Sequence, residues 1–382
     1  MKILTRFLAL LAGMFAAPVA HAEIAPGELV APKIEISGGN LNFTVQPSVA
    51  GRNYQLQYSD TMATGNWTDI GVGCAGDGSN LVISTPCAPG VARRFYRLAL
   101  TEVTSVPDGF VLIPAGGFSM GNTLSVSGDG YSNELPVHSV QVSAFYMAKY
   151  LVTKADWDVV RTWGLTHGYT DLAAGEGKAV YHPVQMLIWY EMVKWCNAWS
   201  EKNGLTPCYT LDGTVCRTTI NDAVVCNWSA NGYRLPTEAE WEKAARGGLS
   251  GKRFPWGDTI NHTYANFYSW SQFYESPKSQ GFHPTYAVNG FPYTSPVGSF
   301  AANGYGLYDM TGNVWEWCWD WYGGYTASMQ TDPRGASSGS MRVYRGGSWG
   351  YDASGCRVAN RGGGPSHRVY DFGFRVARSS IP

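Results

Sequence analysis

Residues 303–317 concentrate groups that could hold a metal ion. The segment reads Asn-Gly-Tyr-Gly-Leu-Tyr-Asp-Met-Thr-Gly-Asn-Val-Trp-Glu-Trp and carries two carboxylates, Asp309 and Glu316. Its glycines let the backbone turn where a side chain would clash, which leaves carbonyl oxygens free to face a cation. Carboxylate and carbonyl oxygens are the ligands that Ca²⁺ prefers. The segment therefore predicts a folded site and not a linker.

Six further blocks lie along the chain, each rich in glycine, proline, aromatic or charged residues. They are Gly116–Gly121, Glu134–His138, Gly232–Glu242, Pro255–Asp258, Arg345–Trp349 and Gly373–Ala377. In this order, and together with residues 303–317, the blocks resemble the formylglycine-generating enzyme or sulfatase-modifying-factor family over roughly residues 109–378. The resemblance implies an α+β domain, expected at residues 109–380, with an irregular C-type-lectin-like fold.

The resemblance also implies two calcium ions. The first ion would be bound by the side chain of Asp309, the main-chain carbonyls of Gly312 and Val314, and the carboxylate of Glu316. The second would be bound by the side chains of Asn266 and Asn289 and the carbonyls of Phe267 and Phe291. Asp309 replaces the family's usual Asn and adds charge, whereas Asn289 stands where Asp is commoner, so we expect the second ion to be held more weakly. The alternative for both loops is that hydrogen bonds alone close them. Several oxygen ligands in one loop favour a cation, because hard cations are bound by several oxygens at once.

The catalytic residues of the family are only partly present. Formylglycine-generating enzymes oxidise a substrate cysteine through two active-site cysteines, five residues apart, that bind copper(I), a soft metal that selects thiolates. The first would fall two residues after Trp349, and that position is Tyr351. Cys356 lies where the second could fall, but it fits better with a structural cysteine just downstream, whose family partner would lie at Ala245. At most one of the two thiols is present, so we do not expect the known copper mechanism.

Iron chemistry is not indicated by neighbouring residues either. The related sulfoxide synthases of thiohistidine synthesis hold iron through clustered histidines. The seven histidines of this chain show no HxxxH spacing, so an iron site would need residues that are distant in sequence. His138 lies in a block where the family often has His, and we expect it to be a structural hydrogen-bonding residue.

A ligand cleft is expected around Ser348, which matches a pocket serine of the family. The other residues expected to line the cleft are Trp315, Trp349, Tyr351, Asn360 and Arg361. Aromatic faces would supply contact area and the polar groups would orient a peptide or small ligand. Ser348, Tyr351 and Cys356 are the candidates for any catalytic role. The alternative is that the tryptophans form the core of a loop-rich fold.

Composition limits the partners and the location. Charged residues make up 15% and aromatic residues 14% of the 382 residues, which is typical of an extracellular, loop-rich globule. The net charge of −1 gives no argument for a nucleic acid or an anionic membrane as partner. Residues 1–22 have a basic start, an apolar run and a small-residue end, which predicts a secretory signal peptide. We therefore expect an exported protein, periplasmic or secreted, without a membrane span.

Eight cysteines in an exported chain are expected to pair. The expected bridges are Cys74–Cys87, Cys216–Cys226 and Cys318–Cys356. The first two are local, and the third joins cysteines that each follow a motif block. The sequence does not connect Cys196 or Cys208 to a partner.

A second pattern precedes the motif blocks. Residues 41–45, 54–59, 80–84 and 94–100 alternate at the period of half-buried strands, and Gly and Asp clusters separate them. The pattern predicts a small β-sandwich at residues 30–101, similar to fibronectin-like modules, that acts as a spacer. A linker at residues 101–108 follows it.

Three helices are predicted in the second domain, at residues 153–162, 188–202 and 237–246. The last begins with Thr237 followed by Glu240, which is a capping box and explains this carboxylate without acid–base chemistry. Arg234 and Arg375 are expected to be buried partners of carboxylates.

Two functions remain open from the sequence. The first is an exported oxidoreductase of the sulfatase-modifying-factor superfamily with altered metal chemistry. The second is a non-catalytic, calcium-stabilised module that binds a peptide, a glycan-processing enzyme or a cell-surface polymer. Family resemblance favours the first, and the missing thiol favours the second.

Overall fold

The computed structural model describes residues 33–37, 39–46, 52–60, 68–70, 74–75, 80–86, 95–102, 106–124, 129–272, 274–367 and 369–380. The chain divides into two compact units, Met1–Pro107 and Asp108–Pro382. The predicted signal peptide at residues 1–22 lies outside the described residues. In the described parts of the chain, no helix is long and apolar enough to cross a membrane.

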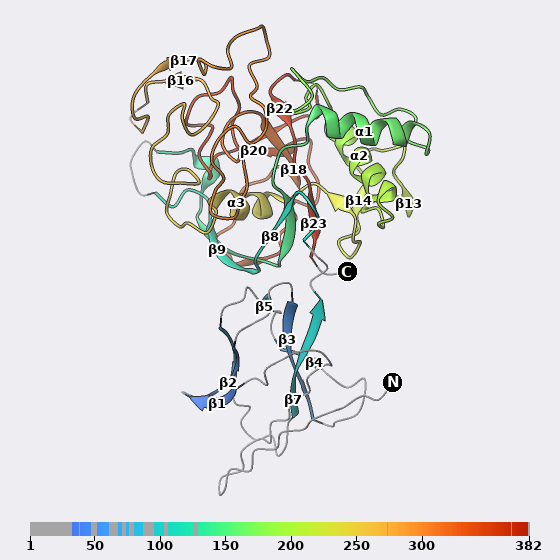
Figure 1. Ribbon diagram of the computed structural model, residues 1–382, viewed down its shortest axis with the longest axis vertical. Coiled ribbons are helices and arrows are strands. Elements are labelled where there is room, and N and C mark those ends of the chain that lie inside the picture. The colour runs from blue at the N-terminus through green and yellow to red at the C-terminus, as the bar shows by residue number, and fades with distance from the viewer. Residues whose placement is uncertain are drawn as a thin grey trace, which may run out of the picture. The chain divides into compact units, whose positions relative to one another are not determined.

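The described part of the first unit is built from strands (Figure 1). One antiparallel sheet contains β1 (Lys33–Ser37), β2 (Asn40–Val45) and β6 (Leu81–Pro86), and a second contains β3 (Arg52–Ser59), β4 (Thr68–Asp69), β5 (Cys74–Ala75) and β7 (Phe95–Glu102). Leu41, Phe43 and Val45 alternate inward along β2 and pack with Tyr54 and Leu56 of β3 in one cluster. The four predicted alternating runs therefore all contain strands, while their likeness to fibronectin modules stays a prediction.

The second unit combines short strands with three helices and long irregular segments. Its sheets, in spatial order, are β15–β23–β11–β8, β19–β10–β9, β21–β20–β18–β22, β13–β12–β14 and β16–β17. The strands are β8 (Phe110–Ile113), β9 (Gly116–Met120), β10 (His138–Val142), β11 (Phe145–Ala148), β12 (Tyr209–Leu211), β13 (Thr214–Val215), β14 (Val225–Cys226), β15 (Tyr233–Arg234), β16 (Ser269–Trp270), β17 (Gln280–Gly281), β18 (Trp315–Trp321), β19 (Gln330–Thr331), β20 (Arg342–Arg345), β21 (Arg361–Gly364), β22 (Phe372–Gly373) and β23 (Ala377–Ser379).

The three predicted helices are present, each within three residues of its expected ends. They are α1 (Lys154–Leu165), α2 (Trp189–Lys202) and α3 (Glu238–Arg246), with a short 3₁₀ helix at Ser132–Glu134. The predicted capping box of α3 is formed by Thr237 and Glu240, and Gly247 ends the helix at a φ of 57°, where a residue without a Cβ is favoured. Helices α1 and α2 lie side by side (Figure 1), with the stacked rings of Trp157 and Trp195 5.7 Å apart.

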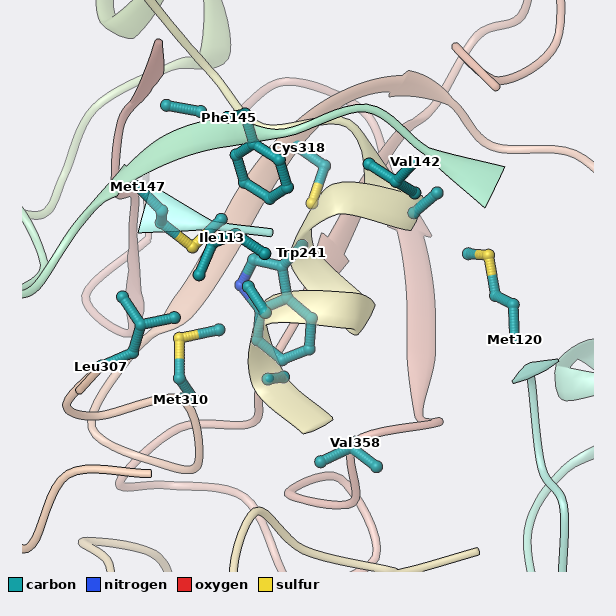
Figure 2. Close-up of a cluster of buried hydrophobic side chains, with 14 of the residues drawn as sticks. Ile113, Met120, Val142, Phe145, Met147, Trp241, Leu307, Met310, Cys318 and Val358 are labelled. Carbon is teal, nitrogen blue, oxygen red and sulfur yellow. The ribbon is translucent and has the colours of Figure 1, made fainter. Parts of the chain in front are cut away.

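Helix α3 supplies the centre of the main core. Trp241 is fully buried among side chains of β8, β11, β18 and β20 and of the loop that carries Leu307 and Met310 (Figure 2). Its indole Nε1 donates a hydrogen bond to Glu316 Oε2 at 2.9 Å. The core contact thus joins the helix to the strand β18, which begins at Trp315.

The same helix is held by buried ion pairs. Arg361 binds Glu238 through two hydrogen bonds of 2.6 and 2.7 Å, and Arg345 binds Glu242. Arg246, one turn along the helix, also donates to Glu242 at 3.0 Å. Because Glu238 and Glu242 of α3 each have a guanidinium partner, these two acids have a structural role and do not form a free acid–base pair.

Candidate functional site

A tight turn after β20 positions the predicted pocket serine, Ser348. Gly347 has a φ of 76°, and a Cβ built on it would lie 2.5 Å from the Cys356 sulfur, so only glycine fits there without displacement. The amide of Trp349 then donates to the carbonyl of Asn313 at 2.9 Å. The turn therefore fixes Ser348 and Trp349 beside the segment that leads into β18.

Ser348 is hydrogen-bonded to a carboxylate that the sequence did not single out. Its Oγ donates to Asp371 Oδ2 at 2.9 Å, and the Asp371 carbonyl accepts from the amide of Trp315 at 2.7 Å. Burial raises the pKa of Asp371, and the hydrogen bond from Ser348 acts in the opposite direction. The only signal in the sequence was its position two residues before the block that starts at Gly373.

Aromatic rings surround this serine, some buried and some exposed. The ring of Trp315 lies 5.1 Å from that of Tyr351, and the ring of Trp349 lies 5.2 Å from that of Phe291. Trp315 and Trp349 are 3% and 6% exposed, whereas Tyr351 and Phe291 are 52% and 56% exposed. We call Trp315, Trp349, Tyr351, Phe291 and Tyr370 the aromatic site. Its tryptophans belong to the core, as the packing alternative expects, and its other rings reach solvent, while ligand binding there stays a prediction.

The Asp309 loop contains a buried carboxylate oxygen without a regular hydrogen bond. Asp309 has a φ of 54°, and its Oδ2 accepts from the amide of Gly298 at 2.7 Å. Its Oδ1 is buried and makes no hydrogen bond of regular geometry, although the side chain of Asn313 is near enough to lower the pKa of Asp309. Burial raises the pKa of Asp309 to about 6, which the hydrogen bond from Gly298 and the charge of Arg375 only partly offset. A cation at Oδ1 would remove this cost, because it would stabilise the ionised carboxylate.

Glu316, the other predicted carboxylate ligand, is paired with Arg375. Arg375 Nε donates to Oε2 at 2.6 Å and Nη2 donates to Oε1 at 2.8 Å. Arg375 lies deep in the core and confirms its predicted role as a carboxylate partner, as Arg234 does with Glu240. The charge of Glu316 also raises the pKa of Asp309. Two buried carboxylates thus share one guanidinium, which leaves one negative charge for a further cation.

The second predicted ion loop shows a weaker arrangement of the same kind. The buried side chain of Asn266 donates through Nδ2 to the carbonyl of Tyr293 at 2.8 Å, while its Oδ1 has no partner. The carbonyl of Phe267 lies 3.1 Å from His262 Nε2 and is therefore already within hydrogen-bonding distance of another group. Asn289 adopts a φ of 59° and is exposed, as is the side chain of Phe291. This loop offers one orphaned side-chain oxygen and no carboxylate.

The chain matches a known family over most of its length. Residues 97–380 match the family described as Sulfatase-modifying factor enzyme 1-like domain. The chain belongs to this family. The predicted family and the mixed α+β class are therefore confirmed.

Relatives of this sulfatase-modifying-factor domain carry different names. The formylglycine-generating enzyme of Mus musculus is 36% identical over 320 residues, which cover 77% of this chain and 80% of that protein. A Bos taurus protein named inactive C-alpha-formylglycine-generating enzyme 2 is 35% identical over 290 residues, which cover 70% of this chain and 87% of that protein. Among solved structures, Treponema denticola variable protein 1 has a TM-score of 0.54 and 31% identity, covering 71% of this chain and 94% of that one.

Cys356, a candidate catalytic residue of this family domain, is inaccessible to solvent. Cys356 is 0% exposed, packs in a cluster with Phe254 and Ile260, and has its pKa raised by burial. Cys318 belongs to a different cluster around Trp241 and both cysteines are free thiols, so the predicted Cys318–Cys356 bridge is not formed in the structure. Tyr351 occupies the other expected thiol position with an exposed phenol. The two positions therefore hold one exposed phenol and one buried thiol.

The polar residues expected to orient a ligand have structural partners instead. Arg361 is bound to Glu238 and stacks on the ring of Tyr325 at 4.0 Å. The carbonyl of Asn360 accepts from the buried Arg345. Both residues are buried, so the polar groups that accompany the aromatic site are Ser348 and Asp371.

The described histidines do not form a metal cluster, and His138 has structural partners. His138 is buried, with Nδ1 3.1 Å from the carbonyl of Pro136 and its ring 4.7 Å from that of Tyr325, as expected of a structural residue. Among the residues that the structure describes, no group of three or more His, Cys, Asp or Glu side chains could hold a metal ion. An additional hollow of about 470 Å³ is lined by Phe118, Lys243 and Tyr305 and by none of the predicted site residues.

Proposed function

We propose that this protein is an exported, ligand-binding member of the sulfatase-modifying-factor family that does not generate formylglycine through a thiolate-bound copper ion. The observation that carries the proposal is the state of the two expected thiol positions. One holds the phenol of Tyr351, and the other, Cys356, is sealed beneath Gly347. A copper(I) ion needs two accessible thiolates, and this pair of positions offers none. The residues therefore do not fit the family's redox metal.

The aromatic site is the proposed binding surface. Exposed rings of Tyr351, Phe291 and Tyr370 offer contact area at a low cost in conformational entropy, since each has two side-chain torsions. The Ser348–Asp371 pair beside them, of which Ser348 is buried and Asp371 half-buried, supplies a polar group of fixed orientation. We propose an exported peptide or a cell-surface polymer as the ligand. The relative named as inactive is consistent with a family in which the domain can lose catalysis.

Calcium is the proposed structural ion of this domain. The support is the orphaned, buried Oδ1 of Asp309 together with the unbalanced charge of the Asp309, Glu316 and Arg375 group. Asp309 and the carbonyls of Gly312 and Val314 would hold the ion, which would supply positive charge to this loop. We propose a role for Glu316 that is mainly electrostatic, because both of its oxygens already accept from Arg375.

The proposal is tested by incubating the purified protein with copper(I), oxygen and a peptide that carries a sulfatase-type cysteine motif. Mass spectrometry measures conversion of the cysteine to an aldehyde, and the Streptomyces coelicolor enzyme named formylglycine-generating enzyme serves as the positive control. We expect no aldehyde above the level of a protein-free sample. Repeated turnover by this protein would refute the proposal.

A binding measurement separates a non-catalytic module from a misfolded sample. A fluorescent peptide with the same motif, but with serine in place of the reactive cysteine, is titrated with wild type and with Tyr351→Ala. Ala at an exposed ring removes contact area without opening the core, and Val159→Ala is a matched exposed control. Binding that falls with Tyr351→Ala alone supports the aromatic site, whereas equal binding by all three proteins contradicts it.

An oxidoreductase with different metal ligands is the second candidate. The observation that favours it is the 36% identity to a formylglycine-generating enzyme over 77% of this chain. Oxygen consumption with added copper or iron, in the presence of the cysteine peptide, distinguishes this candidate from the first. Metal-dependent consumption that requires the folded protein would support it.

A further inference from the structure

Two cysteines that the sequence left apart come together in the sheet β13–β12–β14. Strand β14 pairs antiparallel with β12, and Cys226 lies directly opposite Tyr209. The amide of Asn227 donates to the carbonyl of Cys208 at 2.7 Å, so the pairing continues one residue beyond the strands. Cys208 and Cys226 are therefore diagonal neighbours on two adjacent segments of the sheet.

The side chains of this pair lie near each other. The Cys226 thiol is close enough to act on the Cys208 thiol and to lower its pKa. Cys208 is fully buried and Cys226 is half-buried. Both are thiols in the structure.

The predicted bridge between Cys216 and Cys226 is ruled out by strand order. Strand β12 lies between β13 and β14, and the amide of Cys216 donates to Tyr209 from the β13 side at 3.1 Å. Neighbouring strands are about 4.8 Å apart, so the outer two are separated by about 9 to 10 Å. A disulfide needs Cα atoms within about 7 Å. The other half of the sequence prediction, Cys74–Cys87, lies partly outside the described residues.

We propose that Cys208 and Cys226 form a disulfide bond in the mature protein. The oxidant is a disulfide, either of a thiol–disulfide oxidoreductase or of glutathione. One of the two sulfurs attacks it as the thiolate, forms a mixed disulfide and releases one thiolate. The other sulfur then attacks the first and displaces the second thiolate. The protein loses two protons and two electrons, and the oxidant becomes two thiols.

The bridge would fix a contact that supports the main site. The hydroxyl of Tyr209, which lies between the two cysteines in the sheet, accepts from the amide of Leu235 at 2.8 Å, just before α3. The ring of Tyr209 stacks on Trp319 of β18 at 5.2 Å. A disulfide at Cys208 therefore ties the small sheet to the start of α3 and to the strand that carries Trp315.

The test maps the bond in the full-length protein. Purified, reduced, native protein is incubated with glutathione disulfide, and free thiols are then alkylated. Trypsin cuts after Lys202, Arg217 and Arg234, which leaves Cys208 and Cys216 in one peptide and Cys226 in the next. A second digestion before Asp212 and Asp222 separates all three. We expect a linked pair of residues 203–211 and 222–234 in mass spectrometry. A link to residues 212–217 or to the Cys196 peptide, or full alkylation of both cysteines, would overturn the proposal.

Variants provide a second readout. Cys216→Ala should keep the link and lose thermal stability on reduction as the wild type does. Cys226→Ala should have no link, and its unfolding midpoint should no longer respond to reductant. An equal response to reductant in Cys226→Ala and wild type would contradict the assignment. In cells, formation of the bridge depends on the proposed export, because export brings the protein into an oxidising compartment. The test with purified protein depends neither on export nor on ligand binding.

Discussion

Replacement of Asp309 by Asn tests the proposed calcium site most directly. The variant keeps an oxygen that can accept from the amide of Gly298, but it removes the buried charge. Burial raises the pKa of Asp309 from 3.8 to about 6. At about 1.4 kcal/mol per unit, this shift of about 2 units corresponds to roughly 3 kcal/mol of lost stability at pH 8 when no cation is bound. We therefore expect Asp309→Asn to be more stable than wild type in EGTA at pH 8.

The sign of the pH dependence follows from the raised pKa. Below about pH 4 the Asp309 side chain is protonated in both the folded and the unfolded protein, so it costs no stability. As the pH rises through about 6, the buried side chain must ionise in the folded protein, and the free energy of unfolding falls. Calcium-free wild type should therefore lose stability between these values relative to the variant. Calcium at about 100 times its dissociation constant would return about 2.7 kcal/mol to wild type. The variant should gain much less.

Differential scanning calorimetry in EGTA or calcium, at pH 5 and pH 8, measures these effects. A protein of this size changes its unfolding midpoint by roughly 2 to 4 °C for each kcal/mol of stability. We therefore expect the midpoint of the variant to lie about 6 to 12 °C above that of calcium-free wild type at pH 8. Asp212→Asn, in an exposed turn, is the matched control and should follow wild type. If calcium leaves the wild-type midpoint unchanged at pH 8, or if it raises the midpoints of wild type and Asp309→Asn equally, the reasoning about the orphaned oxygen is refuted.

Three further predictions concern the ion pairs, the helix and the thiol positions. Arg375→Met leaves Glu316 buried without its partner and should cost about 3 to 5 kcal/mol in urea unfolding; a cost below about 1 kcal/mol would show that the pair is dispensable. Thr237→Ala removes the cap of α3 and should cost about 1 kcal/mol by the same measurement, whereas Thr237→Ser should cost little. Tyr351→Cys restores one thiol but leaves Cys356 buried, so we expect no aldehyde in the copper assay; aldehyde formation would show that Cys356 can be reached.

Local signals in the sequence predicted the helices and the arginines well. The capping box at Thr237 depends on residues three positions apart, and the structure forms it as expected. Arg375 could be predicted as a carboxylate partner because a buried guanidinium requires one. Each of these predictions needs only the residue's chemistry or its near neighbours.

Predictions that depended on long-range packing were less successful. Asn360 and Arg361 follow Cys356 closely, but the pairing of β21 with β20 directs Arg361 to Glu238 and away from the aromatic site. The cysteine partners depend on the order of three short strands, which spacing does not reveal. Asp371 escaped notice because an isolated acid near a Gly-Phe block has no pattern of its own.

The ion pairs of α3 also bear on how the chain acquires its structure. Glu238 and Glu242 find their guanidinium partners 123 and 103 residues further along, in Arg361 and Arg345. Until the ribosome has delivered Arg361, burying the helix would leave Glu238 without a guanidinium partner in a low dielectric, whereas Glu242 already has Arg246 one turn away. We infer that a nascent chain truncated before residue 345 cannot complete this core. The C-terminal segment thus acts as a checkpoint that delays compaction, which would suit the proposed export, since an exported chain crosses the membrane before it folds.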